Sequence, residues 1–149
     1  MSQTATAPDT AIVILAAGKG SRMRSAVPKV LHEIAGRPML GHVIAASLET
    51  GASRLCLVTA PNQNEVRDYA LTQVPEISNR IQENQLGTGD AVRAALSACE
   101  GVARVVIMFG DTPLMRPDIL RQLATSEADV CVLGFEPEDT AAYGRIIME

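Results

Sequence analysis

The stretch AIVILAAGKGSRMRSAVPKVL, residues 11–31, decides the fold of this chain. Its apolar start, Ile12–Leu15, is continuous and rich in β-branched side chains, which predicts a fully buried strand. Small residues then form a turn, and a loop without acidic residues carries four cations: Lys19, Arg22, Arg24 and Lys29. Because a polyphosphate needs closely approaching backbone N–H groups and neutralising charge, this pattern favours a phosphate-binding loop over a solvated basic turn.

The composition indicates a folded, acidic chain. Of 149 residues, 47% are apolar and 3% are aromatic, which predicts one domain with an aliphatic core, as in strands covered by helices. The net charge of −4 gives no general reason to bind nucleic acid or an anionic membrane. Both lysines nevertheless lie in the loop after the first strand.

Neither a targeting segment nor a metal-type cysteine pattern is evident. Residues 1–10 lack the basic and apolar regions of a signal peptide. No apolar run approaches the ~18 residues of a membrane span. Cys56, Cys99 and Cys131 are odd in number and have no metal-ligand spacing, so we interpret them as buried thiols in a reducing compartment. We expect a soluble, cytoplasmic protein.

Strand-like and helix-like segments alternate along the chain. Strands are expected at 11–15, 55–58, 81–82, 105–109, 129–135 and from 143 onward. Helices are expected from Pro38 to Gly51, from a cap at Asn62 to Leu71, after Gly89, and from Pro117 to Ala124. This order predicts an α/β fold with a mainly parallel sheet flanked by helices on both faces. We expect a flexible leader at 1–10 and one domain over 11–149, incomplete at its C-terminus because the chain stops in a strand-like run.

Two further features accompany the basic loop. Asp111 follows an apolar run at the carboxyl end of the expected sheet, where open α/β folds bind ligands; it is either a turn cap or a Mg²⁺ ligand beside phosphates. The segment from Gln82 to Thr88 contains Gln85 and Gly87. Its amides offer the donors and acceptors that read a nucleobase, although Thr88 could simply cap a helix.

Other nucleotide-binding and catalytic motifs fit less well. In a dinucleotide fingerprint Gly18 and Gly20 would be the first two glycines, but the third falls on Met23, and the second strand is not followed by a ribose-binding carboxylate. A P-loop would end in Gly-Lys-Ser or Gly-Lys-Thr, which is absent. We interpret His32 and His42 as structural.

Taken together, these motifs resemble the sugar-nucleotide pyrophosphorylases, a nucleotidyltransferase family. The similarity is greatest to the N-terminal uridylyltransferase domain of the bacterial bifunctional N-acetylglucosamine-1-phosphate uridylyltransferase/glucosamine-1-phosphate acetyltransferases. The matching blocks are LAAGKGSRM (15–23), PKVLH (28–32), GRPML (36–40), QLGTG (85–89), GDTPL (110–114) and YGRI (143–146). The first block marks a broad superfamily, and its combination with the later blocks is more specific.

The resemblance implies a Rossmann-like nucleotide-diphospho-sugar transferase fold, with this chain as its nucleotide-binding portion. It implies that UTP and N-acetylglucosamine 1-phosphate give UDP-N-acetylglucosamine, a peptidoglycan precursor, and pyrophosphate, with Mg²⁺ as cofactor. It assigns the nucleotide to Leu15, Ala16, Ala17, Gly18 and Gly20; catalytic phosphate contacts to Arg22 and Lys29; the uracil to Gln82, Gln85, Gly87 and Thr88; Mg²⁺ to Asp111; and the sugar to Gly144.

Several residues and the length depart from the family pattern. Ser21 stands where Thr is usual, Asp90 where His is common, and Phe109 where Tyr is common. The family domain continues beyond residue 149, and the β-helix that carries acetyl transfer and forms a trimer is not in this chain. The alternatives are another nucleotidyltransferase, for a different sugar phosphate or of the molybdenum-cofactor type, and a non-catalytic NTP-binding module.

Overall fold

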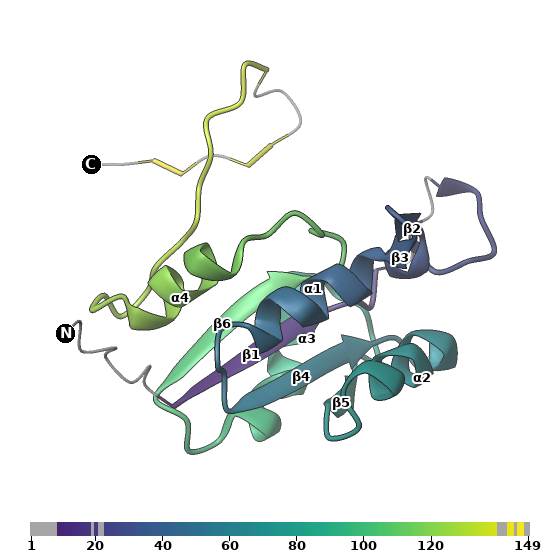
Figure 1. Cartoon of the computed structure of the whole chain (residues 1–149), viewed down its shortest axis with the longest axis horizontal. Coiled ribbons are helices and arrows are strands. Elements are labelled where there is room, and N and C mark those ends of the chain that lie inside the picture. The colour runs from purple at the N-terminus through teal and green to yellow at the C-terminus, as the bar shows by residue number, and fades with distance from the viewer. Residues whose placement is uncertain (1–8, 19, 21–22, 140–142, 145, 148–149) are drawn as a thin grey trace.

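A parallel sheet forms the centre of the molecule (Figure 1). The computed structural model describes residues 9–18, 20, 23–139, 143–144 and 146–147. Four parallel strands pair in the order β5-β4-β1-β6. Their bounds are β1 Thr10–Leu15, β4 Arg54–Thr59, β5 Ser78–Ile81 and β6 Arg104–Phe109. The stretch that opened the sequence analysis therefore supplies a central strand, and the expected parallel α/β sheet is confirmed.

Helices connect the strands and cover the sheet. The α-helices are α1 Met39–Leu48, α2 Asn64–Gln73, α3 Thr88–Ala95 and α4 Pro117–Thr125, and short 3₁₀ helices lie at Lys29–Leu31 and Leu96–Cys99. A small antiparallel hairpin pairs β2 Glu33–Ile34 with β3 Arg37–Pro38. Among the described residues, no helix is long and apolar enough to cross a membrane.

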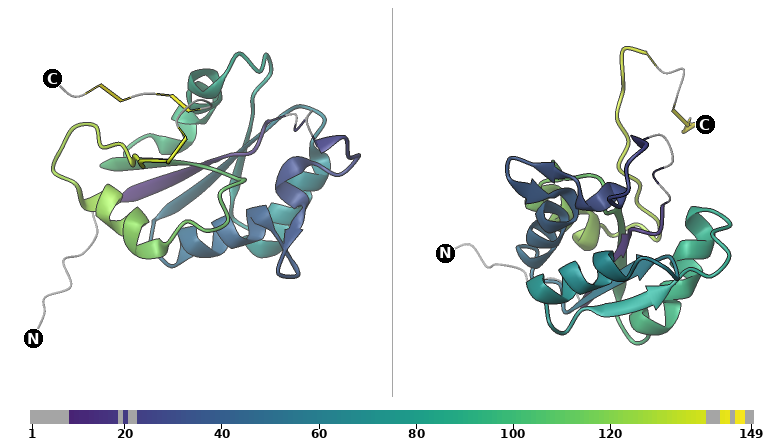
Figure 2. Two further views of the ribbon diagram at one scale, coloured as in Figure 1. Left: turned by 90° about the horizontal axis from the view of Figure 1, so that it is seen from above. Right: turned by 90° about the vertical axis from the view of Figure 1, so that its right-hand side faces the viewer.

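The two faces of the sheet bury different sets of side chains. Alternate residues of a strand point to opposite faces, so Ile12 and Ile14 of β1 pack with apolar residues of α1, α2 and α4. Val13 and Leu15 face the other way and pack against the small residues of α3. Figure 2 shows α1 and α4 on one face of the sheet and α3 on the other. Helices thus cover both faces, as expected.

The boundaries near residue 36 differ from the sequence expectation. The helix begins at Met39, with Pro38 as its N-cap rather than its first residue. Ala35 and Gly36 both have positive φ, 52° and 75°, which is the backbone of a two-residue β-hairpin turn. The glycine therefore closes a hairpin before the helix. The N-cap of α2 is Gln63 rather than Asn62, so this helix begins one residue later than expected, at Asn64. Strand β1 begins at Thr10, one residue earlier than expected.

The expected strand at 129–135 is wrong. Asp129 and Val130 form a bend, residues 131–135 have no regular secondary structure, and Val130 and Phe135 are 80% and 67% exposed. Figure 1 shows this segment leaving the sheet after α4. An apolar, β-branched run indicates strand propensity, but a strand also needs a neighbour for its N–H and C=O groups, which local sequence does not specify. The described residues of 143–147 are likewise outside any strand.

Strand β6 is an edge strand rather than a fully buried one. Its alternating pattern leaves Val105, Ile107 and Phe109 about half exposed. They lie on the same face as Val13, where α3 packs on β1 and β4. The sheet therefore ends at β6, and Asp111 follows an edge strand.

Candidate active site

A cleft of about 700 Å³ opens at the carboxyl ends of the parallel strands. Open α/β sheets bind ligands at this edge because the loops that leave neighbouring strands diverge there. The cleft brings together eleven of the residues assigned from the sequence: Leu15, Ala16, Ala17, Gly18, Gly20, Lys29, Gln82, Gln85, Gly87, Thr88 and Asp111. They come from segments up to 96 positions apart in the chain, between residues 15 and 111. Their roles toward a ligand stay predictions.

The end of β1 forms one wall of the cleft. Ala16 and Ala17 are buried, and the Ala16 N–H donates to the Val58 carbonyl at 2.8 Å, which continues the ladder beyond the strand. The Leu15 carbonyl accepts from the Gly110 N–H at 2.9 Å. This wall therefore presents backbone and methyl groups, which let a ligand approach closely.

Gly20 allows the basic loop to pass Lys29. Its φ is +57°, and a Cβ built on it would lie 2.8 Å from the Lys29 Cβ. Because of this left-handed backbone and this contact, a side chain at position 20 could fit only if the loop rearranged. Gly20 thus determines where the Lys29 side chain begins.

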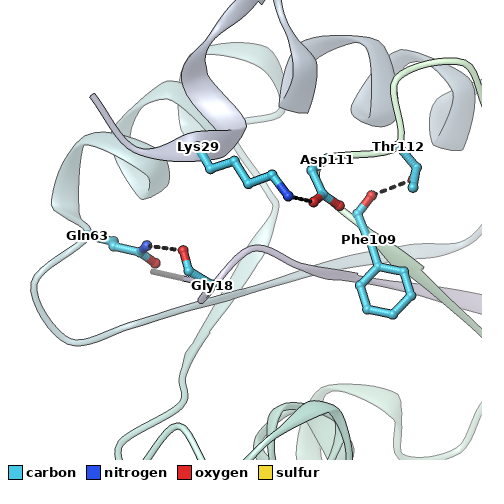
Figure 3. A network of polar contacts seen from close by, with 6 residues as sticks. All are labelled: Gly18, Lys29, Gln63, Phe109, Asp111 and Thr112. Carbon is cyan, nitrogen blue, oxygen red and sulfur yellow. Dashed lines mark hydrogen bonds and ion pairs between the residues drawn. The ribbon is translucent and has the colours of Figure 1, made fainter. Parts of the chain in front are cut away.

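Lys29 and Asp111 form an ion pair across the cleft (Figure 3). The lysine precedes α1 on a short 3₁₀ helix, and the aspartate lies two residues after β6. The turn that carries Asp111 is closed by the Thr112 hydroxyl, which donates to the Phe109 carbonyl at 2.7 Å. The side chains of Lys29 and Asp111 are 41% and 30% exposed, so both charges are accessible from the cleft. The pair places one cation and one carboxylate side by side in the cleft, next to the basic loop.

The donor set fits a Mg²⁺ ion held largely by a substrate. Asp111 is a partly exposed carboxylate lining the cleft. In the part of the chain that the structure describes, no group of three or more His, Cys, Asp or Glu residues could hold a metal. Mg²⁺ commonly uses one or two carboxylates and completes its shell with phosphate oxygens and water. Asp111 is therefore suited to a metal that arrives with a polyphosphate.

The opposite side of the cleft is built after β5. Gln82 is buried, and its backbone N–H donates to the Thr59 carbonyl at 2.8 Å, directly beyond the strand. Its side-chain Nε2 donates to the Gly87 carbonyl at 2.9 Å and to Asp90 Oδ2 at 3.0 Å. Thr88 is the first residue of α3, and Gly87 is its N-cap, so the expected threonine cap is replaced by glycine at φ +114°. This segment presents a fixed amide to the cleft.

Two glutamine side chains hold the β1 loop. Gln85 Nε2 donates to the Ala17 carbonyl at 3.0 Å, which joins the segment after β5 to the end of β1. Gln63 Nε2 donates to the Gly18 carbonyl at 3.4 Å (Figure 3), and its Oε1 accepts from the Ala60 N–H at 2.8 Å. The sequence analysis missed Gln63. Its position just after β4, at the same edge of the sheet, is the signal that could have found it.

Two assigned residues do not join this cleft. Arg22 lies outside the described residues. Gly144 is exposed in the C-terminal segment and is not among the residues that line the cleft. The phosphate role of Arg22 and the sugar role of Gly144 stay predictions.

Comparisons with known proteins agree with this architecture. Residues 12–143 match a family described as MobA-like NTP transferase domain. The bifunctional protein GlmU of Parvibaculum lavamentivorans is 50% identical over 141 residues, which cover 92% of this chain and 31% of that protein. The GlmU of Azorhizobium caulinodans is 44% identical over 142 residues, covering 93% and 32%. The chain thus spans less than a third of the length of these two curated relatives.

Solved structures with the same fold include nucleotidyltransferases. Rv0371c from Mycobacterium tuberculosis superposes with a TM-score of 0.64 at 26% identity, over 79% of this chain and 59% of that one. A nucleotidyl transferase from Methanothermobacter thermautotroptrophicus gives a TM-score of 0.63 at 25% identity, over 77% and 56%. The parallel sheet with flanking helices is therefore a nucleotidyltransferase fold.

Proposed function

This chain belongs to the MobA-like NTP transferase domain family, and on that basis we propose that it supplies the UTP half of a uridylyltransferase site. The proposed reaction joins UTP and N-acetylglucosamine 1-phosphate into UDP-N-acetylglucosamine and pyrophosphate. One observation carries the proposal: Lys29 and Asp111 share a cleft with the Gln82–Thr88 segment. Similarity to the GlmU proteins supports the choice of uridylyl transfer among the reactions of the family.

In this reaction the protein mainly positions the phosphates and neutralises their charge. An oxygen of the sugar phosphate attacks the α-phosphorus of UTP in line, the bond to the β-phosphate oxygen breaks, and pyrophosphate leaves. Lys29 would place its ammonium against the phosphate oxygens, and the backbone of Ala16–Gly18 would line the nucleotide. Asp111 would hold Mg²⁺, which supplies further neutralisation of phosphate charge. No side chain needs to form a covalent intermediate.

The decisive experiment measures binding and turnover together on this chain. UTP, CTP, ATP and GTP are each titrated with and without Mg²⁺ by calorimetry, and pyrophosphate release is followed after adding N-acetylglucosamine 1-phosphate. We expect UTP to bind most tightly in the presence of Mg²⁺. Asp111→Asn is expected to weaken the Mg²⁺ dependence of UTP binding, and Asp68→Asn, which removes an exposed ion-paired carboxylate on α2, is the matched control.

The outcomes separate the three functions under consideration. Pyrophosphate release that requires UTP and the sugar phosphate supports uridylyl transfer. Tight UTP binding without release supports a non-catalytic NTP-binding module. A preference for another nucleotide contradicts the proposal and favours another member of the nucleotidyltransferase family.

A further inference from the structure

The Gln82 side chain is held by two hydrogen-bond acceptors. Only 5% of the residue is exposed, and its Nε2 donates to the Gly87 carbonyl at 2.9 Å and to Asp90 Oδ2 at 3.0 Å. Those two bonds use both hydrogens of the amide nitrogen. The amide therefore has only its oxygen, Oε1, left for a ligand in the cleft that Gln82 lines.

Asp90 and the Gly87 carbonyl together make this orientation one-sided. Turning the amide by 180° would bring Oε1 against a carbonyl oxygen and a carboxylate oxygen, and neither of these groups can donate. A hydroxyl or a histidine at position 90 could donate to Oε1, which would leave only the Gly87 carbonyl to oppose the turned amide. A carboxylate accepts only, so it adds a second, charged acceptor that strengthens the orientation in which Gln82 is an acceptor toward the cleft.

We propose that Asp90 is a positioning residue that sets the nucleobase preference of the cleft through Gln82. The proposal rests on the proposed function, because it concerns how the same site recognises UTP. An acceptor at Oε1 matches a base that presents a ring N–H, such as N3–H of uracil. It is repelled by the lone pair that cytosine carries at the same ring nitrogen. Asp90 thus strengthens the preference, begun by the Gly87 carbonyl, for the amide orientation that reads a donor.

A structural role for Asp90 has to be separated from this one. Asp90 lies in the first turn of α3, where acidic side chains accept hydrogen bonds from backbone N–H groups that the helix leaves free. Its Oδ2 also accepts from the N–H of Leu86, which precedes the helix, at 3.3 Å. If that contact were its whole role, replacing Asp90 would loosen the segment and weaken all nucleotides alike. A role through Gln82 changes the ratio between two bases and disappears when the amide is removed.

The test is a double-mutant cycle on base preference. Wild type, Asp90→Ala, Gln82→Ala and the double variant are titrated with UTP, CTP and, as a probe without a base, pyrophosphate, all with Mg²⁺. Glu83→Ala is the matched control, because Glu83 is an exposed carboxylate in the same segment. Circular dichroism and thermal melting confirm that each variant is folded.

We expect Asp90→Ala to lower the UTP-to-CTP affinity ratio about five- to tenfold, the size of one ordinary hydrogen bond. Pyrophosphate affinity and the Glu83→Ala ratio should stay at the wild-type value. In the Gln82→Ala background, Asp90→Ala should change the ratio no further.

An unchanged ratio in Asp90→Ala overturns the inference, and so does an equal loss for UTP, CTP and pyrophosphate. A full Asp90→Ala effect without the Gln82 amide also overturns it. These results would leave the proposed function intact, since wild type would still prefer UTP. A wild type that does not prefer UTP instead contradicts the proposed function and the inference with it.

Discussion

Lys29→Ala is expected to remove most UTP binding and turnover while leaving the stability of the fold nearly unchanged. The side chains of Lys29 and Asp111 are 41% and 30% exposed, so solvent screens their ion pair. Such pairs stabilise by about 0–1 kcal/mol, and in a domain of this size 1 kcal/mol shifts Tm by about 2–4 °C. We therefore expect Tm to fall by no more than about 4 °C.

The expected effect on the reaction is much larger. Among the described residues that line the cleft, Lys29 is the only cation. Removing one positioned group that stabilises a transferring phosphoryl typically costs about 10²–10³ in rate, or roughly 3–4 kcal/mol. A small loss of folding stability together with a large loss of rate distinguishes a lysine that acts on the ligand from one that supports the fold.

The assay combines thermal melting, UTP titration and pyrophosphate release. Arg67→Ala is the matched control, because Arg67 is also 41% exposed and also forms an ion pair, with Asp68 on α2, but does not line the cleft. Both variants lose one partly exposed cation, so their Tm changes should be similar. Near-normal UTP affinity and turnover in a folded Lys29→Ala protein would refute the reasoning. So would a loss of stability of several kcal/mol, since unfolding would then explain the lost activity.

Two further predictions concern local geometry and burial. Gly20→Ala should cost at least about 1 kcal/mol from its left-handed backbone alone and should weaken UTP binding by displacing Lys29. The control in thermal melting and titration is Gly89→Ala, whose new Cβ meets nothing within 4 Å at a residue that does not line the cleft. Equal effects of the two substitutions would contradict the argument. The interpretation of all three cysteines as buried thiols is wrong for Cys131, which is exposed, whereas Cys56 is buried. Burial raises the pKa of the Cys56 thiol, so alkylation followed by mass spectrometry at about pH 8 should label Cys131 well before Cys56. Labelling of both at the same rate would show that the core opens far more readily than its packing indicates.

The central part of the fold could be predicted because its signals are local. Ile12–Leu15 is a continuous apolar run, and alternating strands and helices favour a parallel sheet whatever the details of packing. Once the sheet is parallel, the turns after its strands must meet at one edge. This reasoning was enough to place Lys29, Asp111 and the segment after β5 around one cleft.

The remaining features depend on contacts between distant residues. Gln63 reaches Gly18 only because β4 lies beside β1, so its place after a strand could indicate the edge of the sheet but not its partner. At 129–135 the sequence instead predicts an element that does not form, because the composition suits a strand but no neighbouring strand pairs with it. The acceptor role of Asp90 is a third case, since sequence shows a carboxylate near a glutamine but not which amide atom it contacts.

The cleft has two halves that share little structure. Lys29 and Asp111 form the side proposed to bind phosphates, on the loops after β1 and β6. Gln82, held by Asp90 of α3, lies on the other side, after β5. A hydrogen bond from the Gln85 side chain to the Ala17 carbonyl links the two halves, and neither Lys29 nor Asp90 takes part in it. Substitutions without shared partners usually add within about 0.3–0.5 kcal/mol. The losses of UTP-binding free energy in Lys29→Ala and Asp90→Ala should therefore sum in the double variant, and a larger discrepancy would mean that the β1 loop transmits strain between the two halves.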